Sequence, residues 1–186
     1  KQTALYLALL NKNEEILNLL LRNKNIHLNE YNLIGLNDDN RKITALHLCV
    51  EKGYLDIAKQ LLSFDSIDVN IPCIYKSKDK KYKKTALFMA ENNDIEMVRL
   101  LLSCNKTNVN IINKETFYSY KYKSDIRYKC LKCKKTSLFR AIELGSIDIV
   151  KLLLSNNQFD VNIINSIISK NSEFNTNDKM ERTALH

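Results

Sequence analysis

Two cysteines separated by two residues, Cys130 and Cys133, are the pattern in this sequence most typical of metal chemistry. Two thiolates can supply half of a tetrahedral zinc site, which needs four ligands. The other cysteines, Cys49, Cys73 and Cys104, are isolated in the sequence and form no second pair. A single Cys-x-x-Cys is a weak signal, so we expect no bound metal and free thiols in a reducing compartment.

The histidines and glycines do not combine into a catalytic pattern either. His27, His47 and His186 are far apart in the sequence, and the three glycines are isolated, which excludes a phosphate-binding glycine-rich loop. Neither a nucleophile elbow nor a paired-histidine metal motif occurs. We therefore expect that the chain is not an enzyme and binds no cofactor.

Lysine and tyrosine gather in two stretches, residues 71–84 and 111–135. The first stretch has six lysines against one aspartate, a charge of +5, and the second has eight basic residues against two acidic ones, a charge of +6. Because the formal net charge of the chain is +8, the remainder sums to −3. Six of the nine tyrosines lie in the same two stretches. This composition suits an acidic protein segment, or a nucleic acid whose phosphates pair with lysine and whose bases stack on tyrosine.

Two plainer explanations of the basic stretches stay open. Lysine-rich loops can be solvated and serve to discourage strand pairing between molecules. Asparagine, lysine and isoleucine are also abundant throughout the chain, as an AT-rich genome would produce.

The basic stretches alternate with copies of one short unit. In the clearest copy, residues 44–70, two apolar stripes at helical spacing flank Gly53, which can adopt a positive φ and end the first helix. Helices this short are marginal alone, so the stripes must pack against neighbouring copies. We expect Cys49, Leu100 and Leu152 among the core residues, together with the stripes of the first copy, which include Tyr6, Leu9, Leu10, Ile16 and Leu17.

The copies are aligned by a Thr-x-Leu opening at Thr3, Thr44, Thr85 and Thr136, with a further start at Thr183. An asparagine follows the first four starts after 26, 26, 25 and 26 residues, and this constant offset marks one supersecondary unit used four times. The predicted modules are 3–29, 44–70, 85–110 and 136–162, with the start of a fifth at 183–186, and the inserts between them are 30–43, 71–84, 111–135 and 163–182.

The module openings resemble the T-P-L-H-x-A opening of the ankyrin repeat. They read TALYLA (3–8), TALHLC (44–49), TALFMA (85–90) and TSLFRA (136–141). The proline of the family is missing in every copy, and its histidine survives only as His47 and His186, with an aromatic residue elsewhere. The resemblance implies an all-α solenoid over residues 1–186, a single array of helix–turn–helix units with projecting β-hairpins. It further implies an intracellular, cytoplasmic scaffold for protein–protein interaction.

The spacing of the modules departs from the family. Successive starts are 41, 41, 51 and 47 residues apart, against a family period of about 33. The excess follows the closing asparagine, where the family has its hairpin. Insert 111–135 alternates as a β-hairpin does, with a turn at 123–125, whereas the composition of 163–182 predicts no regular structure for residues 170–179.

Hairpins of neighbouring repeats lie side by side in the ankyrin family, so the two basic inserts should form one surface. We expect this surface to bind an acidic protein partner; binding of nucleic acid or anionic lipid, and an architectural role in a larger assembly, stay open as alternatives. We also expect the chain to be part of a longer array, with no transmembrane segment among its residues. The residues expected to contact the partner are Lys81, Tyr82, Lys83, Tyr118, Tyr120, Lys121, Tyr122, Arg127, Tyr128, Lys129 and Lys132.

Overall fold

The structure is a computed structural model that describes residues 1–23, 25–35, 40–90, 94–120, 128–171 and 176–182. Of residues 117–120, 128–131, 167–171 and 176–182 it describes the backbone alone. The predicted turn at 123–125 and the fifth start at 183–186 lie outside these residues.

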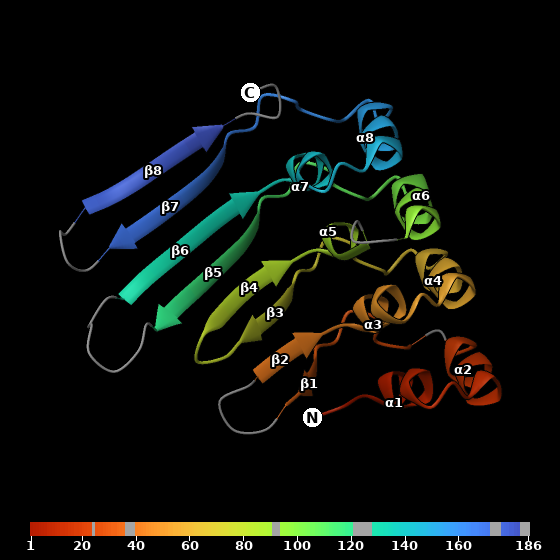
Figure 1. The fold of residues 1–186 in the computed structure, drawn as a ribbon. Helices are drawn as coiled ribbons and strands as arrows, with labels where there is room; N and C mark the ends of the chain where they lie inside the picture. The colour runs from red at the N-terminus through yellow and green to blue at the C-terminus, as the bar shows by residue number, and fades with distance from the viewer. Residues whose placement is uncertain (24, 36–39, 91–93, 121–127, 172–175, 183–186) are drawn as a thin grey trace.

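Helix pairs stack in one direction, and a β-hairpin projects from each pair to the same side (Figure 1). The pairs are α1 (Ala4–Leu10) with α2 (Glu14–Leu21), α3 (Ala45–Lys52) with α4 (Leu55–Leu62), α5 (Ala86–Ala90) with α6 (Ile95–Ser103), and α7 (Ser137–Glu143) with α8 (Ile147–Leu154). The predicted class of helix–turn–helix units with hairpin inserts is confirmed.

The hairpins join into one antiparallel sheet in which the strands lie in chain order. Its strands are β1 (Asn32–Ile34), β2 (Asn40–Ile43), β3 (Cys73–Lys76), β4 (Lys80–Lys84), β5 (Asn113–Tyr120), β6 (Tyr128–Lys135), β7 (Asn165–Asn171) and β8 (Thr176–Arg182). Regular strands β7 and β8 occupy most of 170–179, where composition predicted none. The backbone of β6 explains the difference, because β7 hydrogen-bonds along it from Ser166 to Asn171 whatever its own composition.

The core is a strip of apolar side chains between successive helix pairs. Cys49 is fully buried, as predicted. The expected leucines of the second helices are off by one position: Leu101 and Leu153 are buried, and Leu100 and Leu152 are only partly buried against the core. Successive side chains of a helix point about 100° apart around its axis. When three leucines follow one another, the sequence alone does not show which of them faces the core.

The buried stripe of the first module is narrower than expected. Leu9 and Leu17 are buried, but Leu10 and Ile16 are 47 % and 46 % exposed. The helix end at Gly53 is as predicted: its φ is 67°, and its N–H closes α3 on the carbonyls of Cys49 and Val50.

An asparagine side chain ties each hairpin to its own helix pair in three of the four repeats. The backbone N–H of the opening threonine donates to Oδ1 of the first residue of the hairpin, and the threonine hydroxyl accepts from the N–H three residues on, which caps the helix. The N-to-Oδ1 pairs are Thr3 with Asn32 (2.7 Å), Thr85 with Asn113 (2.8 Å) and Thr136 with Asn165 (2.7 Å).

The second repeat solves the same problem with a different residue. Its hairpin begins with Cys73, which offers no amide oxygen, and the N–H of Thr44 donates instead to Nδ1 of His47 at 3.3 Å. His47 is 1 % exposed. The other three repeats have Tyr6, Phe88 or Phe139 at the histidine position, none of which could accept this bond. Histidine and cysteine in one repeat thus replace an aromatic residue and asparagine in the others.

The asparagines that close the modules join each repeat to the next. The side-chain amide N–H of Asn29 donates to the carbonyl of Ser66, and its Oδ1 accepts from the N–H of Asp68. Asn70 and Asn110 make the same two bonds to the following closing loop. This repeated bridge gives a physical reason for the constant offset from threonine to asparagine in the sequence.

The burial of adjacent leucines predicts a large difference in stability between two neighbouring substitutions in α8. Leu153→Ala should lower the free energy of unfolding by roughly 2–5 kcal/mol, because Leu153 has no solvent exposure. Leu154→Ala, at a position that is 50 % exposed, should cost less than about 1 kcal/mol. Urea titration monitored by circular dichroism measures both, and equal losses would contradict the placement of the core.

The replacement of asparagine by His47 as the acceptor in the second repeat predicts that a second substitution can restore stability lost by a first. His47→Phe should cost about 1–3 kcal/mol of stability, because it leaves the buried N–H of Thr44 without an acceptor. Adding Cys73→Asn should recover most of that loss by recreating the arrangement of Thr85, Phe88 and Asn113. Urea unfolding of the two variants tests this, and a double variant no more stable than His47→Phe would refute the exchange.

Burial of His47 also predicts a pH dependence. Loss of hydration for the charged imidazolium lowers the pKa of His47 from 6.5 to about 4. The unfolded chain therefore takes up this proton first, so the stability contribution is complete above about pH 6.5 and is lost as pH falls towards 4, by roughly 3 kcal/mol. Urea unfolding across this range should show the loss in the native chain and not in the double variant His47→Phe with Cys73→Asn; parallel curves would contradict it.

Candidate functional site

The strand register sorts the side chains of the hairpins onto two faces. Residues paired across strands share a face, and neighbours along a strand point to opposite faces. In β4, Lys81 and Lys83 are exposed, whereas Lys80, Tyr82 and Lys84 are partly buried. We call the side of Lys81 and Lys83 the outer face and the side of Tyr82 the inner face.

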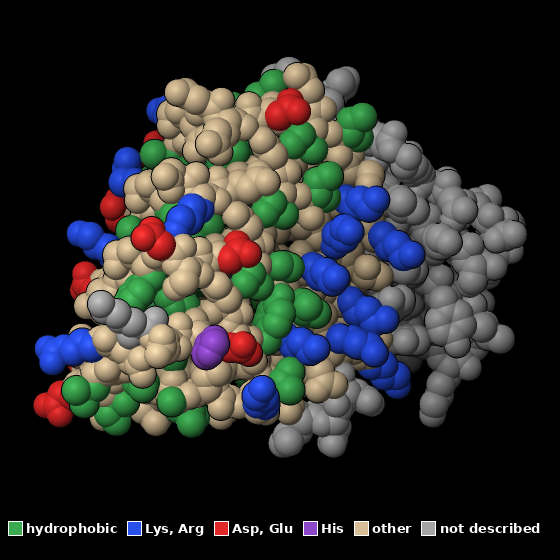
Figure 2. Space-filling model, turned by 180° about the vertical axis from the view of Figure 1, so that it is seen from behind, with side chains coloured by type: hydrophobic (Ala, Val, Ile, Leu, Met, Phe, Trp, Pro, Cys, Tyr) green, Lys and Arg blue, Asp and Glu red, His purple; other side chains and the backbone are tan. Residues whose placement is uncertain are grey.

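The outer face carries a continuous array of lysines. One cross-strand row contains Lys42, Ile74, Lys83, Lys114 and Lys134 in register, and the next contains Lys76, Lys81, Thr116 and Lys132. We call the seven lysines of these rows the lysine face: Lys42, Lys76, Lys81, Lys83, Lys114, Lys132 and Lys134. All seven are exposed, and Figure 2 shows them as a blue band beside the residues drawn in grey.

The lysine face has a high density of positive charge. Lys83, Lys114 and Lys134 lie on three adjacent strands, which are spaced about 4.8 Å apart in a sheet. From β2 to β6 neither row contains an acidic residue; the first row continues through Ser166 in β7 to Glu181 in β8. Closely spaced charges of one sign on a flat surface produce a field that attracts a polyanion.

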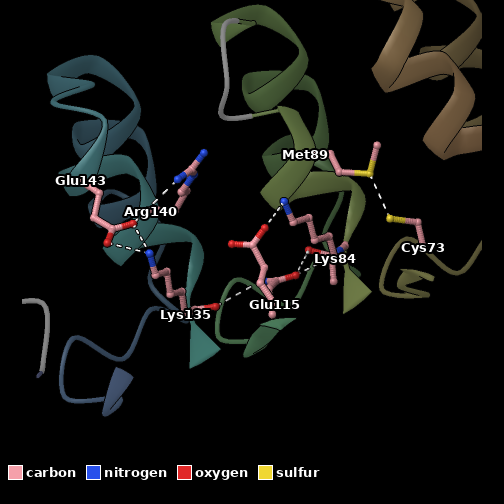
Figure 3. A network of polar contacts seen from close by, with 9 residues as sticks. Cys73, Lys84, Met89, Glu115, Lys135, Arg140 and Glu143 are labelled. Atoms are coloured by element: carbon pink, nitrogen blue, oxygen red, sulfur yellow. Dashed lines mark hydrogen bonds and ion pairs between the residues drawn. The ribbon is translucent and has the colours of Figure 1, made fainter. Parts of the chain in front are cut away.

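Three cations on the inner face are paired with glutamates. Arg41 in β2 contacts both carboxylate oxygens of Glu51 in α3, at 3.1 and 2.6 Å. Lys84 in β4 contacts Glu115 in β5 at 2.5 Å, and Nζ of Lys135 in β6 lies 2.7 Å from both oxygens of Glu143 in α7 (Figure 3). These ion pairs neutralise the side of the sheet that faces the first helices.

Two tyrosines of the second hairpin also lie on the inner face. The rings of Tyr75 and Tyr82 stack with centroids 4.8 Å apart, and Nζ of Lys84 lies 4.9 Å from the centroid of the Tyr82 ring. Burial raises the pKa of the Tyr82 hydroxyl above its ordinary value. These aromatic side chains are therefore separated from the exposed lysines by the thickness of the sheet.

Residues expected from the sequence to contact a partner are thus placed on different faces. Lys81, Lys83 and Lys132 belong to the lysine face, and Tyr82 lies on the inner face. Tyr118 and Tyr120 in β5, and Tyr128 and Lys129 in β6, are described by backbone alone, and Lys121, Tyr122 and Arg127 lie outside the described residues.

Sequence reasoning missed four members of the lysine face: Lys42, Lys76, Lys114 and Lys134. For Lys134 a signal was present in the period-two alternation of KCLKCKK, which places it on the same face as Lys132. Lys42 offered no such signal, because it lies in an insert with little net charge and joins the others only through the pairing of β2 with β3.

Metal ligation has little support in the described residues. No group of three histidine, cysteine, aspartate or glutamate side chains among them could hold an ion. Cys133 is buried, and burial raises the pKa of its thiol. The side chain of Cys130 lies outside the described residues, so free thiols at the Cys-x-x-Cys stay a prediction. No helix in the described part of the chain is long and apolar enough to cross a membrane.

The stacked helix–turn–helix pairs with projecting hairpins define the class: a solenoid repeat protein. A family model described as three copies of the ankyrin repeat matches residues 1–73, 31–113 and 73–165. The chain belongs to the ankyrin-repeat family, whose repeats generally mediate protein–protein interaction and are typically non-enzymatic.

A solved structure is similar to the chain along its whole length. The crystal structure of the ankyrin repeat protein EF0377 matches with a TM-score of 0.59 at 20% sequence identity, over 100% of this chain and 70% of that one. A likeness at this identity supports the fold and no particular partner. No curated protein sequence matches the chain.

Proposed function

We propose that the chain is a non-catalytic protein-interaction module that binds an acidic protein segment through the lysine face. The observation that carries the proposal is the sorting of charge between the two sides of one sheet. Arg41, Lys84 and Lys135 on the inner face have glutamate partners, whereas the rows of the lysine face contain no acidic residue on the strands that carry them, β2 to β6. An anionic segment would add negative charge along these rows.

A protein segment fits this face better than a nucleic acid. In the second hairpin, the aromatic side chains of Tyr75 and Tyr82 lie on the opposite side of the sheet from the lysine face. Binding of single-stranded nucleic acid combines backbone neutralisation with stacking of bases on aromatic rings. Carboxylates need only the lysines, and each can pair with an ammonium group without stacking.

The cysteines support an intracellular, cytoplasmic location for this module. Outside the Cys-x-x-Cys, Cys49, Cys73 and Cys104 are free thiols, and the first two are fully buried. Free thiols persist in reducing compartments, whereas extracellular proteins form disulfides.

Charge reversal on the lysine face tests the proposal. A labelled oligoglutamate peptide should bind the chain in a fluorescence anisotropy titration at low salt. Lys83→Glu with Lys134→Glu, two changes in one cross-strand row, should weaken this binding by about tenfold or more, since each removes an attraction and adds a repulsion.

The matched control places the same change in net charge on the helices. Lys59→Glu with Lys151→Glu reverses two exposed lysines of α4 and α8 and should leave the affinity within about threefold. If both double variants weaken binding equally, the loss of affinity reflects the overall charge of the chain, and the proposed site is overturned. If the chain binds a thymidine oligonucleotide more tightly than oligoglutamate, the partner is a nucleic acid. If it sediments with phosphatidylserine vesicles and binds neither of the other two probes, the partner is an anionic lipid.

A further inference from the structure

A shallow depression with an apolar floor interrupts the lysine face. Its volume is about 370 Å³, enough for a large side chain. Ile74 in β3 is the one aliphatic residue of its lining, and it is paired across strands with Lys42 on one side and Lys83 on the other. We call this feature the Ile74 depression; its outer-face lining is Ile74, Lys76, Lys81, Lys83, Lys114 and Thr116.

The surroundings of Ile74 combine apolar surface with charge in a regular geometry. Lys83 lies directly opposite Ile74 on the neighbouring strand, roughly 5 Å away, and Lys76 lies two residues along the same strand, roughly 7 Å away. An extended partner segment presents every second side chain to one side with the same spacing of roughly 7 Å. Where such a segment crosses the strands over Ile74, acidic residues two positions before and after the apolar one lie near Lys42 and Lys83, whose flexible side chains cover the difference in spacing.

A second apolar feature lies where the sheet meets the helical body. The residue preceding each odd-numbered strand is apolar or aromatic, and Figure 2 shows hydrophobic side chains beside the blue band. The hydroxyl of Tyr31 donates to the carbonyl of Pro72 at 2.8 Å, which joins the first two positions of this border. Ile112 and Ile164 are 39 % and 53 % exposed. The four residues of the apolar border are Tyr31, Pro72, Ile112 and Ile164.

We propose that the Ile74 depression is the anchor site for the partner. An apolar side chain of an acidic segment enters the depression, and the carboxylates two residues before and after it pair with lysines of the rim. Further apolar side chains of the segment can contact the apolar border. This inference rests on the proposed function and adds the chemistry of the partner: an acidic segment with an apolar residue in its centre, rather than a run of acidic residues alone.

The depression favours a peptide over the other polyanions. A bilayer surface is broad and flat, whereas the apolar floor at Ile74 is recessed among lysine side chains and can be reached by a single projecting group. A nucleic acid backbone offers phosphates and sugars but no apolar side chain for the floor. Buried apolar anchors surrounded by polar contacts are the usual source of affinity in protein interfaces.

Two probes separate this inference from the proposed function. One is an oligoglutamate peptide with a leucine in its centre, and the other is the same peptide with glycine at that position. The leucine peptide should bind about tenfold more tightly, because a side chain of this size loses much of its contact with water in the depression. Equal affinities would overturn the anchor site and leave the proposed function intact; absence of binding by both would overturn the proposed function.

Variants locate the preference for leucine. Ile74→Ser should abolish the tighter binding of the leucine peptide and change the affinity for the glycine peptide by less than about threefold. Leu33→Ser, in the same cross-strand row and 44 % exposed on β1, is the matched control and should retain it. Lys83→Gln with Lys114→Gln should weaken the binding of both peptides by the same factor. A preference that survives Ile74→Ser, or that is lost with Leu33→Ser, would show that the leucine binds elsewhere.

The folding of Ile74→Ser is checked by circular dichroism before the titration. If this variant does not fold, Thr116→Tyr replaces it, since a larger side chain at this half-buried rim position fills the depression from above. Thr116→Tyr should likewise remove the preference for leucine, and an unchanged preference would overturn the anchor site.

Discussion

The arrangement of this protein depends on an acceptor for one backbone N–H in each repeat, which is partly buried in the first repeat and buried in the next three. The N–H of the opening threonine lies where a hairpin ends and a helix begins, and a buried donor without a partner costs about 1–3 kcal/mol. Asn32, Asn113 and Asn165 meet this requirement from the first position of their own hairpins. His47 meets it from within the helix, where the hairpin has Cys73. Each solution fixes the start of a hairpin relative to its helix pair.

Fixing the start of each hairpin also decides which side chains each face of the sheet presents. Side chains alternate along a strand, so a slip of one residue would exchange the faces completely. In β4 such a slip would turn Lys81 and Lys83 towards the first helices and expose Tyr82 instead. The ion pair of Lys84 with Glu115 requires the observed register and would be lost with it. The threonine contacts fix where each hairpin starts, and the pairing of the strands then places the lysines on the outer face.

The sequence predicted the repeats well because each module must stack on the next, and stacking imposes a constant length. The closing asparagines make the contacts between successive modules, as Asn70 does with Lys106 and Asn108, and therefore recur at a constant distance from the opening threonines. The distribution of lysines over two faces was not predictable in the same way. It depends on pairing between hairpins from different repeats, as with Lys42 and Ile74, and nothing in the local sequence of either strand specifies its neighbour.

An array of like charges on adjacent strands is itself unfavourable. Like charges placed directly opposite one another destabilise a sheet, and Lys83, Lys114 and Lys134 form such a series. An acidic residue on one of these three strands could have relieved the repulsion, as Glu115 does for Lys84 on the inner face. Since a bound polyanion relieves the same repulsion, its binding free energy adds to the stability of the hairpins. An acidic partner would thus be bound by the lysine face and would in turn stabilise the sheet that presents it.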